Sequence, residues 1–198
     1  DKFANNYLDL RRKKGMDLNT AVKTMKNPLY FGAMMVREKM ADVTLAGAQN
    51  TTGDVLRAAL QIIGVAKGFS VVSSCFAMVL TDNNVLTFGD CAVVPNPTAD
   101  QLAEIAISTA QTHRRLTGEE PRVAMLSFST KGSATHELAE KVIHATQIAK
   151  ERQPDLLVDG EMQFDAAFVE EVGTKKAPGS PVAGKANVFI FPDLQAGN

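Results

Sequence analysis

The sequence lacks any strong excess of charge, since 21 Lys and Arg residues stand against 22 Asp and Glu residues in a chain of 198. Such a balance provides neither a basic surface for nucleic acid nor an acidic tail. The chain also lacks a secretory signal and an apolar run long enough to span a bilayer. These absences favour a cytoplasmic globular protein that binds neither nucleic acid nor membrane.

Cysteine and histidine are also scarce. Cys75 and Cys91 are isolated and lack the spacing of metal ligands, which is typical of reduced thiols in a cytoplasm. His113, His136 and His144 lie on or beside helical patterns without a ligand-like arrangement. We therefore expect no bound metal.

What the sequence does contain is a set of hydroxyl-rich turns at the ends of predicted strands. A short apolar run, Val123–Leu126, precedes the turn Ser127–Ser133, and a long helical pattern follows it. Strand, turn and helix form the half-unit of a parallel α/β sheet, in which ligands bind at the carboxyl ends of strands. The hydroxyls, the cation and the backbone N–H groups of Ser129, Thr130 and Lys131 suit an anion. The same residue types also favour simple helix capping, and both interpretations stay open.

A second turn of this kind precedes a predicted helix over Val55–Ile63. It follows a predicted strand over Val43–Ala46 and contains Thr51 and Thr52. Arg57 lies one turn into the helix, where its guanidinium could fold back over the unpaired N–H groups and clamp an oxyanion. The alternative is an exposed arginine on an amphipathic helix.

A third candidate is the pair of carboxylates of Asp159 and Glu161, which follow a predicted strand over Leu156–Val158. Carboxylates at a strand end can act as general acid and base. Capping and packing is the more frequent role, and we favour it here.

Six ordered stretches of the chain resemble the phosphate acetyltransferase (phosphotransacetylase) family over nearly its whole length. They are Tyr30–Val36, Leu56–Ile63, Gly89–Thr98, Met125–Ser133, Asp159–Ala167 and Ser180–Asp193.

The resemblance implies an α/β fold of two domains with a cleft between them, similar to the isocitrate and isopropylmalate dehydrogenases. Residues 1–65 would be part of the first domain, and residues 66–198 would be most of the second, with a largely parallel sheet. The resemblance also implies reversible acetyl transfer between acetyl phosphate and coenzyme A by a homodimer. Coenzyme A is then a substrate, and no metal or prosthetic group takes part.

The resemblance further assigns individual residues. Arg11 and Arg57 match the catalytic arginines of the family, and Cys75 matches a position that is cysteine in some relatives. The substrate-binding residues, of which the last three line the wall of the cleft, would be Thr51, Thr52, Ser129, Thr130 and Lys131.

One part of the family pattern has no counterpart. The family's Ser-Arg pair, and the aspartate proposed to take the thiol proton, follow the last predicted strand, Asn187–Phe191, in a segment that this sequence does not contain. We therefore expect an internal fragment that is inactive alone. Two rival functions remain: acyl transfer of the phosphate butyryltransferase type, and a regulatory domain that senses acetyl coenzyme A, as in bacterial malic enzymes.

Overall fold

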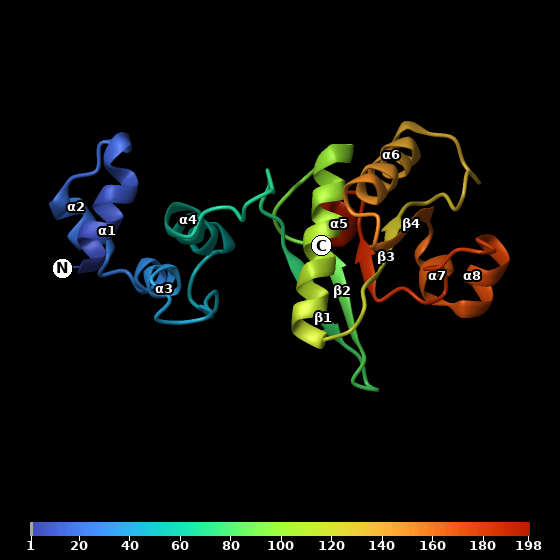
Figure 1. Ribbon diagram of the computed structural model, residues 1–198, viewed down its shortest axis with the longest axis horizontal. Coiled ribbons are helices and arrows are strands. Elements are labelled where there is room, and N and C mark those ends of the chain that lie inside the picture. The colour runs from blue at the N-terminus through green and yellow to red at the C-terminus, as the bar shows by residue number, and fades with distance from the viewer. Residues whose placement is uncertain (1) are drawn as a thin grey trace. The chain divides into compact units, whose positions relative to one another are not determined.

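A computed structural model describes residues 2–198 of the chain. The chain divides into two compact units, Asp1–Lys67 and Gly68–Asn198 (Figure 1). The division expected from the sequence, between residues 65 and 66, lies close to this boundary. That the two units correspond to the two family domains stays a prediction.

The first unit is built from helices. They are α1 (Lys2–Arg11), the short 3-10 helix η1 (Arg12–Lys14), α2 (Leu18–Thr24), α3 (Pro28–Arg37) and α4 (Thr52–Ile62). The small core includes Tyr7, Ala21, Met34 and Ile62, all fully or almost fully buried. Asp17 precedes a helical pattern, and the sequence predicts that it caps this helix; the structure confirms the cap, because the Asp17 carboxylate accepts a hydrogen bond from the Thr20 N–H at 2.9 Å at the start of α2.

The prediction of a strand over Val43–Ala46 is wrong. This segment is irregular, and the side chains of Val43 and Leu45 are 77% and 99% exposed. A strand needs a neighbour to satisfy its backbone hydrogen bonds, and residues 2–67 contain no other strand. The apolar pattern alone therefore could not produce one.

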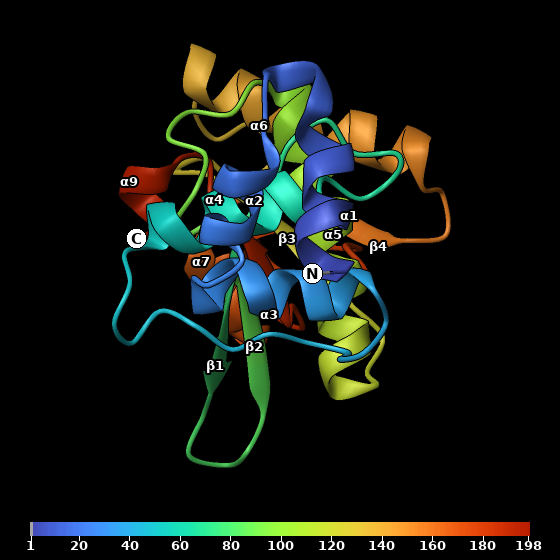
Figure 2. The same cartoon turned by 90° about the vertical axis from the view of Figure 1, so that its left-hand side faces the viewer.

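The second unit contains a five-stranded sheet in the order β1-β2-β5-β3-β4. The strands are β1 (Cys75–Val79), β2 (Val85–Gly89), β3 (Arg122–Leu126), β4 (Leu157–Met162) and β5 (Val188–Ile190). β1 and β2 form an antiparallel hairpin, and the remaining neighbours run parallel. The hairpin tip projects beyond the helices of its unit (Figures 1 and 2).

Five helices accompany the sheet: α5 (Ala99–Thr117), α6 (Glu137–Arg152), α7 (Phe164–Phe168), α8 (Glu170–Lys176) and α9 (Leu194–Gly197). Thr98, with Gln101 three residues later, predicts a capping box from the sequence. The structure confirms it at the start of α5, where the Thr98 hydroxyl accepts from the Gln101 N–H and the Gln101 side chain accepts from the Thr98 N–H. The sequence predicts one helix over Phe164–Val172, but the structure has two, because Val169 is extended between them.

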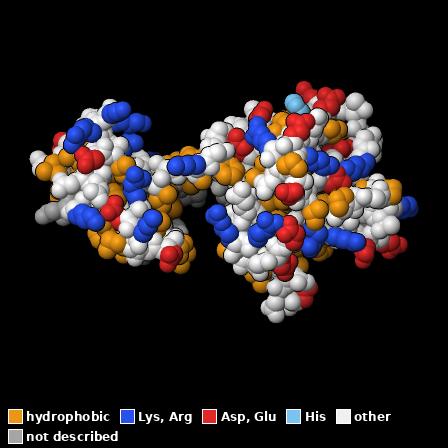
Figure 3. Space-filling model, viewed as in Figure 1, with side chains coloured by type: hydrophobic (Ala, Val, Ile, Leu, Met, Phe, Trp, Pro, Cys, Tyr) orange, Lys and Arg blue, Asp and Glu red, His pale blue; other side chains and the backbone are white. Residues whose placement is uncertain are grey.

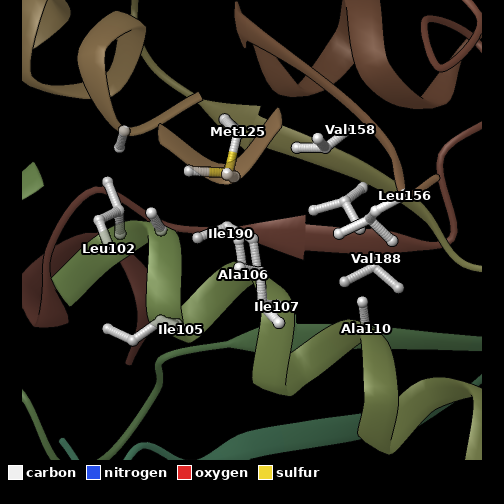
Figure 4. Close-up of a cluster of buried hydrophobic side chains, with 14 of the residues drawn as sticks. Leu102, Ile105, Ala106, Ile107, Ala110, Met125, Leu156, Val158, Val188 and Ile190 are labelled. Carbon is white, nitrogen blue, oxygen red and sulfur yellow. The ribbon is translucent and has the colours of Figure 1, made fainter. Parts of the chain in front are cut away.

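Alternating side chains of the strands build a core on each face of the sheet. Val123 and Met125 of β3 pack with α5 and α6, whereas Ala124 and Leu126 pack with α7 and the 182–186 loop. Figure 4 shows Leu102, Ala106 and Ala110 of α5 pointing toward the strands. Strands covered on both faces read as continuous apolar runs, which explains the sequence of β3.

The sheet corrects the architecture expected from the sequence. A mixed sheet with helices on both faces fits the α/β class, but the expected likeness to isocitrate and isopropylmalate dehydrogenases is wrong. The edge strand β1 runs antiparallel to β2, and residues 2–67 contain helices but no second sheet. Positive and negative side chains are interspersed on the visible face of the second unit (Figure 3), as expected for a net charge of −1.

Candidate functional site

The first candidate site lies at the N-terminus of α4. Thr51 is extended and caps the helix, accepting from the Asp54 N–H at 3.2 Å and donating from its hydroxyl to Asp54 Oδ2 at 2.7 Å. Arg57 Nη1 donates to Asp54 Oδ1 at 2.8 Å. Asp54 therefore joins the threonine hydroxyl and the guanidinium, and the hydrogen bonds from Thr51 and then Arg57 hold its pKa below the usual value.

The guanidinium thus folds back toward the start of its helix, as the sequence predicted. Its partner there is a carboxylate of the same helix. The Arg57 side chain is still 60% exposed, and a guanidinium has five N–H donors, so most of them remain available to a ligand. Thr52, the first residue of α4, is exposed beside it. An arginine next to a helix N-terminus suits the phosphate groups of a ligand.

Arg11 lies at the end of α1, and its Nε atom is buried without a hydrogen-bond partner among residues 2–198. Burial raises the pKa of Tyr7, one turn earlier, and the Arg11 cation opposes that rise. The Tyr7 hydroxyl donates to Gln61 Oε1 at 2.6 Å and ties α1 to α4. Within the described chain no hydrogen bond or ion pair links the Arg11 side chain to the Thr51–Asp54 turn.

The second candidate site is the turn after β3. Glu161 is 3% exposed, and its Oε1 atom accepts from the Ser129 hydroxyl at 2.7 Å and from the Gly132 N–H at 2.8 Å. The Lys131 N–H also donates to the Glu161 carbonyl at 3.1 Å. The turn therefore does hold an anionic group, and that group is the chain's own carboxylate.

The neighbouring carboxylate, Asp159, is also engaged. It accepts from Lys131 Nζ at 2.6 Å, from Lys150 Nζ at 3.0 Å and from the Ser180 hydroxyl at 2.6 Å. Burial raises the pKa of Asp159, but these hydrogen bonds outweigh it and lower the pKa to about 2. So acidic a group is a poor base near neutral pH. The structure therefore favours the packing role over general acid and base catalysis for this carboxylate.

The hydroxyl group of Thr130 is likewise engaged in hydrogen bonds within the chain. Its hydroxyl accepts from the Gln163 N–H at 2.9 Å and approaches Gln163 Oε1 at 3.3 Å. Ser129 and Thr130 are both buried, whereas the Lys131 side chain is 37% exposed. Of the three wall residues predicted here, only Lys131 presents a charged group to solvent.

A cavity that sequence reasoning missed opens at the carboxyl ends of β3 and β5. Its volume is about 320 Å³, and its walls are largely apolar. It is lined by Phe128, Leu138, Phe164, Phe191, Pro192 and Asp193 among others. The available signal was the phenylalanine that follows each of β3, β4 and β5 within two residues. An apolar cavity at this edge of a parallel sheet suits the uncharged part of a ligand.

The two cysteines are free thiols. Burial, and then the charge of Asp90, raise the pKa of Cys75, and the same causes raise that of Cys91 to about 11. Both thiols are thus weak nucleophiles near neutral pH. Among residues 2–198, no group of three or more His, Cys, Asp or Glu side chains is arranged to hold a metal ion. No helix in the same range has the length and apolar character needed to cross a membrane.

Comparisons with known proteins give a consistent picture. Phosphate acetyltransferase of Thermoanaerobacterium thermosaccharolyticum is 55% identical over 203 residues, which cover 100% of this chain and 62% of that protein. Phosphate acetyltransferase of Nitratidesulfovibrio vulgaris is 53% identical over 100% of this chain and 28% of its own length. The chain thus spans less than two thirds of these relatives.

Solved structures agree. A phosphotransacetylase from Streptococcus pyogenes superposes with a TM-score of 0.90 at 46% identity, covering 100% of this chain and 60% of the other. A branched-chain phosphotransacylase from Enterococcus faecalis shares the fold, with a TM-score of 0.68 at 21% identity over 86% of this chain and 61% of the other. The phosphotransacetylase fold therefore replaces the dehydrogenase-like architecture expected from the sequence. A model of the family described as phosphate acetyl/butaryl transferase matches residues 1–198, and the chain belongs to that family.

Proposed function

We propose that the complete protein to which this chain belongs transfers an acetyl group reversibly between acetyl phosphate and coenzyme A. The observation that carries the proposal is the 55% identity, over 100% of this chain, to a protein named phosphate acetyltransferase. The exposed guanidinium of Arg57 beside the N-terminus of α4 supplies a matching chemical feature, because both substrates carry phosphate groups.

In the proposed reaction the coenzyme A thiol loses its proton to a base, and the thiolate attacks the acetyl carbonyl carbon. The C–S bond forms, the bond from that carbon to the phosphate oxygen breaks, and phosphate leaves with the electron pair. Negative charge develops first on the carbonyl oxygen and then on phosphate. Preorganised cations and N–H donors stabilise such charges most effectively when they are already in place.

The proposal gives roles to the residues predicted from the sequence. Arg11, Arg57, Thr51 and Thr52 contact the phosphate groups of the substrates. Ser129, Thr130 and Lys131 form part of the binding wall by holding the turn after β3 in shape, since their polar atoms already bond to Glu161, Gln163 and Asp159.

The remaining features of the proposal concern partners and location. The protein acts as a homodimer, without a metal or prosthetic group, and coenzyme A is a substrate. Its two free thiols suit the cytoplasm. The runner-up is butyryl transfer, because the family description covers both acyl groups and a longer acyl group needs only a roomier pocket.

Arg57→Lys tests the proposed site, with Arg12→Lys as a matched control. Each arginine is exposed and donates at 2.8 Å to an aspartate three residues earlier on its own segment, Asp54 or Asp9. Lysine keeps the charge but not the planar fork of donors. In the complete protein Arg57→Lys should lower kcat/KM for acetyl phosphate by about 100-fold, and Arg12→Lys should leave it unchanged. Equal, small losses in the two variants would show that Arg57 is an ordinary surface residue.

A further inference from the structure

The position of α4 within the first unit depends on contacts at one end of the helix. The stretch that leads into it, residues 38–51, contains no helix or strand, so the backbone connection alone does not fix where α4 lies. At the N-terminal turn, the side chains of Thr51 and Arg57 both hydrogen-bond to Asp54 of the same segment. The contacts that hold α4 against its neighbours therefore lie further along the helix.

Within residues 2–198, two side-chain hydrogen bonds reach α4 from other helices, and both meet its C-terminal turn. Tyr7 of α1 donates from its hydroxyl to Gln61 Oε1 at 2.6 Å. Arg37 of α3 donates from Nη1 to the Ile62 carbonyl at 2.6 Å, and a cation suits this end of a helix. Hydrogen bonds are directional, whereas apolar contacts are not. The two bonds therefore fix both the place and the rotation of α4.

The hydrogen bond from Tyr7 acts as a rigid link between α1 and α4. Tyr7 is 2% exposed, and its ring lies edge-on to that of Tyr30 with centroids 5.9 Å apart. A buried tyrosine ring is confined by its neighbours, and its hydroxyl needs a partner inside the protein. The position of the Tyr7 hydroxyl thus decides where Gln61 lies.

Each end of this link lies one helical turn from an arginine. Tyr7 precedes Arg11 by four residues on α1, and Gln61 follows Arg57 by four residues on α4. Residues four apart share a face of a helix. A shift of Gln61 against Tyr7 would therefore shift Arg57 against Arg11.

We infer that Tyr7 and Gln61 are positioning residues for the transfer reaction, because their hydrogen bond sets where Arg57 stands relative to Arg11. The inference rests on the proposed function, in which both arginines contact the phosphate groups of the substrates. Neither Tyr7 nor Gln61 has to touch a substrate. A misplacement of about 1 Å can slow an enzymatic reaction about 100-fold, so the loss of this hydrogen bond should slow transfer even where the fold survives.

Tyr7→Phe and Gln61→Leu each remove the hydrogen bond and keep most of the side chain. In the complete protein each variant should lower kcat/KM for acetyl phosphate by about 10-fold. The double variant should lose no more than either single one, because both changes remove the same interaction. Tyr30→Phe is the matched control, since Tyr30 packs against the same cluster and its hydroxyl makes no hydrogen bond within residues 2–198. It should leave kcat/KM unchanged.

Combination with Arg57→Lys separates positioning from a general loss of folded protein. Lysine cannot make the forked contact that an accurately placed guanidinium makes. In the Arg57→Lys background, Tyr7→Phe should therefore lower kcat/KM by no more than about two-fold. A change that merely reduced the amount of folded enzyme would cause the same loss in both backgrounds.

The outcomes distinguish this inference from the proposed function. Nearly unchanged activity in both Tyr7→Phe and Gln61→Leu would overturn the positioning role and leave acetyl transfer and the Arg57 site in place. An equal loss from Tyr7→Phe with and without Arg57→Lys would overturn it in the same way. If Arg57→Lys by itself had no effect, the proposed site would be wrong and the positioning role would fall with it.

Discussion

Neutralising Asp159 should lower the free energy of unfolding of the second unit by an amount that follows from the contacts of this side chain. The Asp159 side chain is 6% exposed and accepts from two lysines and a serine. A pKa of about 2, against the ordinary 3.8, corresponds to about 2 kcal/mol of stability near neutral pH, at about 1.36 kcal/mol per pH unit. Asp159→Asn keeps the size of the side chain and removes that contribution.

Hydrogen exchange of the backbone amides of β3 and β4 measures the loss directly, because such central amides exchange through large-scale opening. A loss of about 2 kcal/mol should speed their exchange about 30-fold. Asp100→Asn is the matched control: Asp100 also pairs with a cation, Arg152, at 2.6 Å, but its side chain is 67% exposed. Exposed pairs contribute little, so this variant should change exchange by no more than about two- to three-fold.

The stability that Asp159 contributes should also depend on pH, which gives a second test. The folded pKa of Asp159 is depressed, so the unfolded chain takes up the proton first as the pH falls below 3.8. The stability that Asp159 contributes should therefore be fully present above about pH 4 and lost as the pH falls through about 2. If Asp159→Asn behaves like Asp100→Asn at pH 7, or if its deficit is still complete at pH 2, the reasoning is refuted.

Three further perturbations have defined outcomes. His113 is fully buried, its Nε2 atom has no hydrogen-bond partner among the described residues, and burial lowers its pKa. The unfolded chain therefore takes up the proton first, and the free energy of unfolding should fall as the pH drops below about 6.5. His113→Gln should flatten this fall, which urea unfolding at a series of pH values, followed by circular dichroism, would measure. A Cβ at residue 89 would lie 2.4 Å from Thr109 Oγ1, so Gly89→Ala should cost about 1–3 kcal/mol in the same assay, partly restored by Thr109→Ala. Thr51→Val removes the cap of α4 and should speed exchange of the Asp54 amide about five-fold, a loss of about 1 kcal/mol, whereas Thr51→Ser should not.

The features predicted correctly from the sequence depend on residues close together in the chain. The cap of Asp17 on α2 and the capping box of Thr98 and Gln101 involve separations of three residues, and local sequence suffices to specify them. The long helix α5 and the buried strand β3 carry equally local apolar patterns.

The features missed depend on distant partners. The sequence of Val43–Ala46 is suited to a strand, but no strand lies beside it in residues 2–67. The turn after β3 was recognised as suited to an anion, yet its anion, Glu161, comes from 32 residues away from Ser129. The pairing of Asp159 with Lys131 spans 28 residues. A single sequence gives the chemistry of such groups without saying which of them meet.

The attachment of Glu161 to the same chain changes what the turn after β3 can do in solution. Its carboxylate cannot diffuse away, so it competes with any free anion at an effective concentration at least on the order of millimolar. A free phosphate would also have to replace the bonds that Ser129 and Gly132 already make, and Glu161 would then be buried without partners, at a cost of several kcal/mol. A free phosphate therefore competes poorly with Glu161 for the hydrogen bonds of this turn.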